Sequence, residues 1–174
     1  MGTDLFRSLL RRQAASVVVV TAATDPPVGF TATSFTSVSL NPPLVSFNVD
    51  RASTSWPALQ TAGYVGVHIL GAGQEGLART FATAGADRFA HPTPWRPGPH
   101  GVPLLDDAPA WLICRITARV PAGDHMIVVA EPLVGEHVDE PRQPLIYHMG
   151  RYLTVPPDGA VDQDPPPGPG EAQP

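Results

Sequence analysis

The stretch at residues 28–56 constrains the fold more than any other part of the chain, because strand-forming residues alternate there with short polar ones. Threonine, valine and phenylalanine favour extended structure over residues 28–40, and Asn41-Pro42-Pro43 ends it because proline lacks a backbone donor. Over residues 44–49 every second residue is apolar, which predicts a second, half-buried strand. We therefore expect two antiparallel strands that present polar side chains at a shared edge.

The same stretch carries ten hydroxyl side chains, more than strand packing requires. They are Thr31, Thr33, Ser34, Thr36, Ser37, Ser39, Ser46, Ser53, Thr54 and Ser55. Short neutral groups of this kind, together with the backbone N–H groups of the turn at residues 53–55, suit a phosphate or a polar heterocycle better than a metal ion. The alternative is that the hydroxyls lie on a solvent-exposed face, and periodicity alone leaves both interpretations open.

The remaining chain contains further strand patterns and a few short helical ones. Apolar residues at helical spacing predict a helix over residues 3–13, and a β-branched run predicts a strand buried on both faces over residues 15–23. A helical turn is expected at residues 55–61. Further strands are predicted at residues 64–70, 110–120, 125–134, 144–149 and 151–155.

Length and composition limit the class of protein. With 174 residues, of which 43% are hydrophobic, the chain is expected to form one domain with its own core. The net charge of −5 and the lack of a Lys/Arg cluster argue against nucleic acid or an anionic membrane as partner. The single Cys114 excludes an internal disulfide, and no apolar stretch is long enough to cross a bilayer or to form a signal peptide. We therefore expect a cytoplasmic protein.

The composition changes at residue 156. Seven of the last nineteen residues are proline and none has a large apolar side chain, so the segment cannot bury enough surface to offset its ordering entropy. We expect a folded domain at residues 1–155 and a disordered tail at residues 156–174.

Several other patterns in the sequence bear on function. Residues 71–76 spell G-x-G-x-x-G, but no second parallel strand with an acidic end follows, so chance is the better interpretation. Arg88 beside Phe89 could bind a phosphate and offer a stacking surface, or could cap a helix with the ring in the core. His125 alone would be a structural or solvated histidine. The histidines show no metal-ligand spacing, and there is no nucleophile elbow or Walker loop.

Seven segments, in order, resemble those of the flavin reductase family with the FMN-binding split-barrel fold. Members of this family are the small NAD(P)H-using partners of two-component flavin monooxygenases. The segments are SVVVVTA at 16–22, VGFTATSFTSVSLNPPLVSFNVDRASTSWPAL at 28–59, FATAGADRF at 81–89, GVPLL at 101–105, AWLICRI at 110–116, GDHMIVVAEPL at 123–133 and PLIYHMGRY at 144–152. The resemblance runs from about residue 5 to residue 155, and its specificity lies in the ordered set.

The resemblance implies a mainly β fold, an antiparallel Greek-key split barrel of about six strands with a few short helices. We expect the helix over residues 3–13 to pack across this barrel. The resemblance also implies a homodimer with the flavin near the subunit interface. The flavin would be FMN, with FAD possible, the cosubstrate would be NADH or NADPH, and the partner would be a flavin-dependent monooxygenase component.

The resemblance further implies roles for named residues. Flavin contacts are expected from Thr31, Thr33, Ser34, Phe47, Asn48, Val49, Ser53, Thr54, Ser55, Arg88 and Phe89. Backbone groups at residues 47–49 would meet the pyrimidine edge of the ring, and Arg88 would offset the phosphate charge. His125, oriented by Asp124, would bind the nicotinamide or take part in proton balance. Arg151 and Tyr152 would lie near NAD(P)H, although an exposed edge-strand arginine is an equal interpretation of Arg151.

The expected reaction is hydride transfer from NAD(P)H to FMN or FAD, followed by release of the reduced flavin to a monooxygenase. The alternatives are a flavin carrier or redox sensor on the same barrel, and an oxidase of the pyridoxamine phosphate type, which would want more basic residues. Thr33 stands where many relatives carry asparagine, which leaves the choice of FMN or FAD open. The sequence names neither the partner oxygenase nor the preference for NADH or NADPH.

Overall fold

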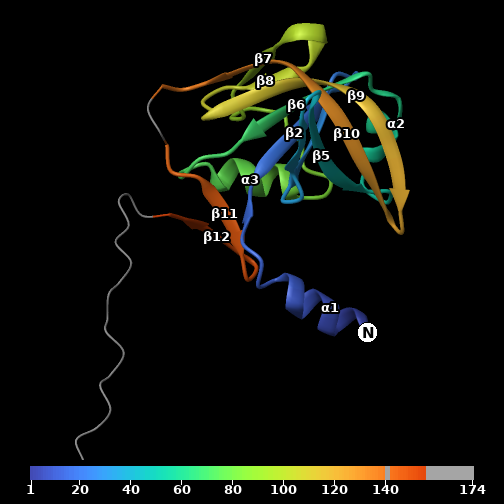
Figure 1. Ribbon diagram of the computed structural model, residues 1–174. Coiled ribbons are helices and arrows are strands. Elements are labelled where there is room, and N and C mark those ends of the chain that lie inside the picture. Colours follow the sequence, from blue (N-terminus) through green and yellow to red (C-terminus); the bar gives the residue numbers. More distant parts are fainter. Residues whose placement is uncertain (140–141, 156–174) are drawn as a thin grey trace, which may run out of the picture.

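The computed structural model describes residues 1–139 and 142–155, which form mainly antiparallel β-structure with three short α-helices (Figure 1). The helices are α1 (Thr3–Leu10), α2 (Trp56–Thr61) and α3 (Glu75–Ala82), and a 3-10 turn covers Pro99–Gly101. The strands are β1 (Ala15–Ser16), β2 (Val18–Ala22), β3 (Val28–Ala32), β4 (Thr36–Leu40), β5 (Pro43–Asp50), β6 (Tyr64–Ile69), β7 (Trp95–Pro97), β8 (Pro103–Leu105), β9 (Ala110–Ala122), β10 (His125–His137), β11 (Leu145–His148) and β12 (Arg151–Thr154). The tail expected at residues 156–174 lies outside the described residues.

Seven strands form one curved sheet in the order β3-β2-β6-β9-β10-β5-β4, and their pairings are antiparallel. Two smaller sheets, β1-β11-β12 and β7-β8, lie beside it. The predicted antiparallel β fold is confirmed, although the main sheet has seven strands rather than about six. No helix among the described residues is long and apolar enough to cross a membrane.

Strand β2 lies inside the main sheet and is buried on both faces, as its unbroken run of β-branched residues predicted. Because successive side chains of a strand point to opposite faces, the run contributes to two cores. Val18 and Val20 belong to the cluster in the interior of the sheet. Val17 and Val19 belong to a second cluster that includes Phe81 of α3. Strand β2 therefore contributes side chains both to the interior of the sheet and to the cluster that packs against α3.

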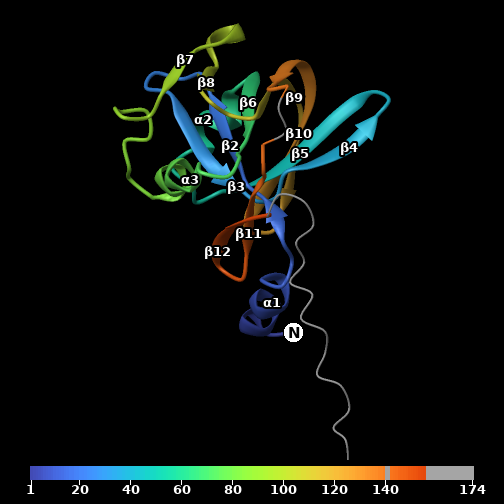
Figure 2. The ribbon, with the colours of Figure 1, turned by 90° about the vertical axis from the view of Figure 1, so that its left-hand side faces the viewer.

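The prediction of one strand over residues 28–40 is wrong, because this stretch forms two strands that pair with different neighbours. Strand β3 pairs with β2, whereas β4 pairs with β5, and residues 33–35 between them belong to no strand. The two strands therefore lie at opposite edges of the main sheet. Strand propensity shows that a residue favours extended structure, but it does not show which neighbour the strand will pair with. In Figure 2 the β4–β5 hairpin projects to one side of the molecule.

Helix α1 does not pack across the barrel as expected. It ends at Leu10, and none of its residues is buried. Its apolar side chains Leu5, Phe6, Leu9 and Leu10 are 47–56% exposed. Figures 1 and 2 show the helix beyond the β11–β12 hairpin, away from the main sheet. The apolar stripe that predicted the helix is thus present, but within one chain it remains half uncovered.

A buried histidine attaches the short strand β8 to the main sheet. The backbone N–H of Leu105 donates to Nε2 of His68 at 3.1 Å, so the opposite ring nitrogen, Nδ1, carries the proton and donates to the carbonyl of Val19 at 3.2 Å. The Thr21 hydroxyl donates to the carbonyl of Pro103 at 2.7 Å. Burial lowers the pKa of His68 to about 4, from an ordinary value of 6.5. These contacts require the neutral imidazole, because a second ring proton would face the Leu105 N–H.

Acid should therefore destabilise the fold through His68. Between pH 6.5 and pH 4 the unfolded chain binds a proton at this residue that the folded chain does not, so the free energy of unfolding falls as the pH is lowered through this window. The shift corresponds to about 3 kcal/mol at pH 4. Denaturant unfolding at pH 7 and pH 4 should show this loss in the wild type in excess of the loss in His68→Gln, which cannot take up the proton. Equal losses in the two proteins would contradict the prediction.

Candidate functional site

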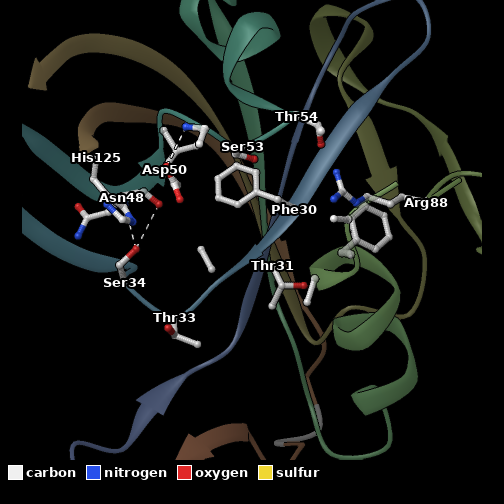
Figure 3. Close-up of a pocket in the computed structure, with 16 residues that line it drawn as sticks. Phe30, Thr31, Thr33, Ser34, Asn48, Asp50, Ser53, Thr54, Arg88 and His125 are labelled. Carbon is white, nitrogen blue, oxygen red and sulfur yellow. Dashed lines mark hydrogen bonds between the residues drawn. The ribbon is translucent and has the colours of Figure 1, made fainter. Parts of the chain in front are cut away.

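A cavity of about 480 Å³ lies between β3 and the end of β5, where the main sheet does not close on itself (Figure 3). Helix α3 and the segment at Arg88 form a second wall, and His125 at the start of β10 lies at the far end. The volume falls within the range of roughly 300–1,000 Å³ that is usual for small-molecule sites. The lining residues are Phe30, Thr31, Ala32, Thr33, Ser34, Asn48, Val49, Asp50, Ala52, Ser53, Thr54, Phe81, Ala82, Ala84, Arg88 and His125.

Three of the hydroxyl groups in the cavity remain available to a ligand. Those of Thr33 and Thr54 have no hydrogen-bond partner in the described part of the chain. Ser53 Oγ accepts from the backbone N–H of Ser55 at 3.2 Å, which leaves its own proton free to donate. Figure 3 shows Ser53 and Thr54 on one side of Phe30 and Thr33 near Ser34. A polar ligand in this space would therefore find neutral donors on two sides.

Two other hydroxyl groups hold the cavity wall together. Thr31 Oγ1 donates to the carbonyl of Ala78 at 2.6 Å and so joins β3 to α3. The backbone N–H of Asn48 donates to Ser34 Oγ at 2.9 Å, and Ser34 Oγ also lies 3.5 Å from the Asn48 carbonyl. Because β4 pairs with β5 only as far as Ser46, the Ser34 side chain occupies the position where a strand partner of Asn48 would lie.

Among the residues that the structure describes, only neutral oxygen atoms hold Arg88 against the barrel. Its Nη1 donates to the carbonyl of Gly29 at 2.8 Å and to Ser55 Oγ at 3.1 Å, and its Nη2 donates to the carbonyl of Thr83 at 3.0 Å. Its Nε is buried and has no hydrogen-bond partner among the described residues. Burial also lowers the pKa of this guanidinium. A buried donor without a partner is costly, so an anionic group beside Arg88 would be stabilised.

His125 and Asp124 form a pair at the turn between β9 and β10. The His125 Nδ1 lies 2.7 Å from Asp124 Oδ1, as expected for a carboxylate that orients an imidazole ring. This hydrogen bond holds the pKa of Asp124 below its ordinary value. The other ring nitrogen, Nε2, remains available at the end of the cavity that Arg88 does not occupy.

The structure brings together nine of the residues that the sequence predicted for binding. These are Thr31, Thr33, Ser34, Asn48, Val49, Ser53, Thr54, Arg88 and His125. Ser55 lies behind the wall, 1% exposed, where it contacts Arg88. Phe47 does not line the cavity, because the alternation of β5 places its side chain in the core.

Three further predicted residues lie outside this cavity. Phe89 packs with Phe81 and Trp95, with ring centroids 5.3 and 5.4 Å away, and so takes the core position that was its alternative interpretation. Tyr152 packs against Tyr147 on the β11–β12 hairpin, and the neighbouring Arg151 is exposed. Within one chain, Arg151 and Tyr152 therefore do not lie beside His125.

Seven of the sixteen lining residues were missed by sequence reasoning, and two of them, Phe30 and Asp50, bear on the chemistry of the cavity. Phe30 lies in the middle of β3 and contacts Phe47, with ring centroids 6.1 Å apart, so it resembles an ordinary core residue in the sequence. Asp50 Oδ1 accepts from the backbone N–H of Ala52 at 2.8 Å, and its carbonyl accepts from the N–H of Ser53 at 3.0 Å. An aspartate whose side chain accepts from the backbone N–H two residues later is a recognisable turn signal. This signal identifies Asp50 as the residue that positions Ser53.

The arrangement suits a ligand with a phosphate, a polyhydroxy chain and an aromatic ring. Arg88 supplies one cationic fork, the three free hydroxyl groups supply neutral donors, and Phe30 and Val49 supply apolar surface. These are the groups that a flavin mononucleotide would need. The described residues contain no group of three or more His, Cys, Asp or Glu side chains that could hold a metal ion.

Comparison with known proteins gives consistent results. Residues 10–156 match the family model described as a flavin reductase like domain. The NADH:FMN oxidoreductase of Rhodococcus qingshengii is 42% identical over 159 residues, which cover 88% of this chain and 82% of the relative. The reductase subunit of a flavin-dependent monooxygenase from Mycobacterium tuberculosis is 33% identical over 156 residues, which cover 88% and 82%.

A solved structure agrees with these sequence matches. The NADH:FAD oxidoreductase of Streptomyces globisporus C-1027, solved in complex with NAD and FAD fragments, superposes with a TM-score of 0.84 at 35% identity. The superposition covers 88% of this chain and 93% of that chain. The expected split-barrel fold is thereby confirmed.

The contact between Ser34 and Asn48 can be tested through stability. Ser34→Ala removes the acceptor of the Asn48 N–H and should lower the free energy of unfolding by about 1 kcal/mol. Ser37→Ala is the matched control, because Ser37 is an exposed serine of β4 that lines none of the wall. It should change stability by less than about 0.5 kcal/mol. Denaturant unfolding measures both values, and equal effects would show that the Ser34 hydroxyl does not hold the wall.

Proposed function

The chain belongs to the flavin reductase family, and we propose that it oxidises NADH, reduces a flavin and supplies the reduced flavin to a separate monooxygenase. The observation that carries the proposal is the cavity that Arg88 lines together with the hydroxyl groups of Thr33, Ser53 and Thr54. The Nε of Arg88 is buried and has no hydrogen-bond partner in the part of the chain that the structure describes. Relatives named as NADH:FMN and NADH:FAD oxidoreductases support the reaction class.

The chemistry that a flavin and a reduced nicotinamide supply together is hydride transfer from C4 of the nicotinamide to N5 of the flavin ring. The part of the protein is to bind the flavin and the nicotinamide, to orient their rings and to exclude water. Arg88 would offset the phosphate charge, while Ser53 and Thr54 would donate to phosphate oxygens and Thr33 to the hydroxyl-bearing chain. The unpaired edge of β5 near Asn48 lies along the wall that the pyrimidine edge of the ring would meet. His125, which Asp124 orients, would contact the nicotinamide.

We propose FMN as the preferred flavin, with FAD as an acceptable second. FMN is the flavin named for the relative at 42% identity. The cavity offers one guanidinium and neutral hydroxyl groups, which are enough hydrogen-bond donors for a single phosphate. FAD is the flavin named for the superposed oxidoreductase, so relatives of this chain are named for either flavin.

We also propose that the active protein is a homodimer, as the family resemblance implies. The half-exposed apolar stripe of α1 supports this, because an eight-residue helix with no buried residue gains little stability from its own chain. A second subunit would cover that stripe. Arg151 and Tyr152 lie away from His125 within one chain, so their expected role at NAD(P)H also depends on a second subunit.

The assigned reaction and the role of Arg88 can be tested together. Purified protein mixed with NADH and FMN should bleach the nicotinamide absorbance catalytically, whereas a flavin carrier would bind FMN without turnover. Arg88→Ala should raise the KM for FMN by roughly 10- to 100-fold, the value of a charge-assisted hydrogen bond. Arg96→Ala is the control, since Arg96 is exposed and pairs with Asp106. No turnover in the wild type would overturn the function, and an unchanged KM in Arg88→Ala would overturn the site.

The role of His125 predicts an effect on the cosubstrate rather than on the flavin. His125→Ala should lower kcat/KM for NADH by about 10-fold, which corresponds to about 1.4 kcal/mol, and should leave the Kd for FMN within about twofold. His137→Ala, at the other end of β10 and exposed, should behave as the wild type. Steady-state kinetics with varied NADH, together with flavin titration, measure both quantities. A loss of FMN affinity instead of NADH efficiency would place His125 at the flavin.

A further inference from the structure

Arg119 of β9 has no role in the function proposed above, but its side chain contacts an element that continues into the site. Its Nε donates to the carbonyl of Leu59 at 3.0 Å, and its Nη2 donates to the carbonyl of Ala62. Both carbonyls lie at the carboxyl end of α2, which Figure 1 shows beside β9. One half-buried guanidinium therefore joins segments that are 57 and 60 residues apart in the sequence.

Helix α2 depends on contacts outside itself for its position. It has six residues, which are too few for a helix that is stable alone, and Leu59 is its buried residue. The last carbonyls of a helix have no partner within it, and the negative end of the helix dipole lies there. A cation that donates to two carbonyls at this end satisfies both requirements. Arg119 therefore fixes the carboxyl end of α2 on β9.

The amino end of the same helix continues into the turn that lines the cavity. The backbone N–H of Trp56 donates to the carbonyl of Ser53 at 3.0 Å, and the N–H of Leu59 donates to the carbonyl of Ser55 at 3.1 Å. Ser53 and Thr54 of that turn line the cavity. A displacement of α2 therefore moves the backbone that carries these two hydroxyl groups.

His125, at the other end of the cavity, is held without α2. It is paired in the sheet with Ala122 of β9 and with Asp50 of β5. These ladders of backbone hydrogen bonds continue along the strands, so the loss of one side chain of β9 should leave His125 in place. The contacts of Arg119 therefore bear on the end of the cavity formed by residues 53 and 54 rather than on the end formed by His125.

We propose that Arg119 is a positioning residue for flavin binding, which holds α2 so that the hydroxyl groups of Ser53 and Thr54 face the ligand. The proposal rests on the function proposed above and adds a residue that is not part of the cavity lining. A misplacement of about 1 Å in a binding group can lower catalytic efficiency by roughly 100-fold. Even a smaller displacement of α2 should therefore be measurable in the affinity for FMN.

Arg119→Ala should raise the Kd and the KM for FMN about tenfold, while kcat at saturating FMN and the KM for NADH stay within about twofold of the wild type. Titration of flavin fluorescence measures the Kd without turnover, and steady-state kinetics measure the other values. A merely structural role would lower the folded fraction, and with it kcat, but would leave the KM for FMN unchanged. Arg115→Ala is the matched control, because it removes the same charge from an exposed position of β9 that pairs with Glu131. It should bind FMN as the wild type does.

Arg119→Lys keeps the charge but loses the planar fork, so it should raise the Kd for FMN by a smaller factor, about threefold. This variant decides the test if Arg119→Ala does not fold. A Kd for FMN equal to that of the wild type, or an equal rise in Arg115→Ala, would overturn the positioning role. A wild type that bound FMN but did not oxidise NADH would instead contradict the reductase function, and the Kd values would still decide the role of Arg119.

Discussion

The gap between β3 and β5 is the constraint on which the rest of the molecule depends. A sheet that closed there with a backbone ladder would have no room for a ligand, and a sheet that stayed open would expose its interior cluster to water. The chain closes the gap with side chains instead. Ser34 contacts both backbone groups of Asn48, and Ser55, in the turn after β5, donates to the carbonyl of Gly29 in β3. Because these links are discrete hydrogen bonds, space remains between them, and that space is the cavity.

The hydroxyl-rich stretch illustrates what a sequence does and does not determine. Its composition correctly indicated a polar edge, and the buried β2, the long β9–β10 hairpin and the final β11–β12 hairpin were all foreseeable from periodicity and turn residues. The contact that each hydroxyl group makes was not foreseeable. Thr31 hydrogen-bonds to α3 and Ser34 to β5, while Thr33 between them has no hydrogen-bond partner among the described residues. These roles depend on which segments become neighbours, and short-range patterns carry no information about contacts between distant segments.

The same limit explains the residues that were placed wrongly or missed. Phe89 and Phe30 are both aromatic residues beside a predicted site, yet Phe30 lines the cavity and Phe89 packs against Trp95. The apolar stripe of α1 predicted the helix correctly, but amphipathicity does not show whether the covering surface belongs to the same chain. In both cases the local pattern was right, and the partner was determined by tertiary or quaternary contacts.

The electrostatics of Arg88 connect the architecture to function. Most buried cations are paired with a carboxylate, since an unpaired charge loses its hydration without compensation. Among the described residues Arg88 donates hydrogen bonds only to neutral oxygens, so no carboxylate balances its positive charge there. An anionic ligand supplies the missing countercharge, which favours binding of a phosphate. One guanidinium supported by neutral hydroxyls offers few charge-assisted hydrogen bonds to such a phosphate, which accords with a reductase that passes its reduced flavin to another protein.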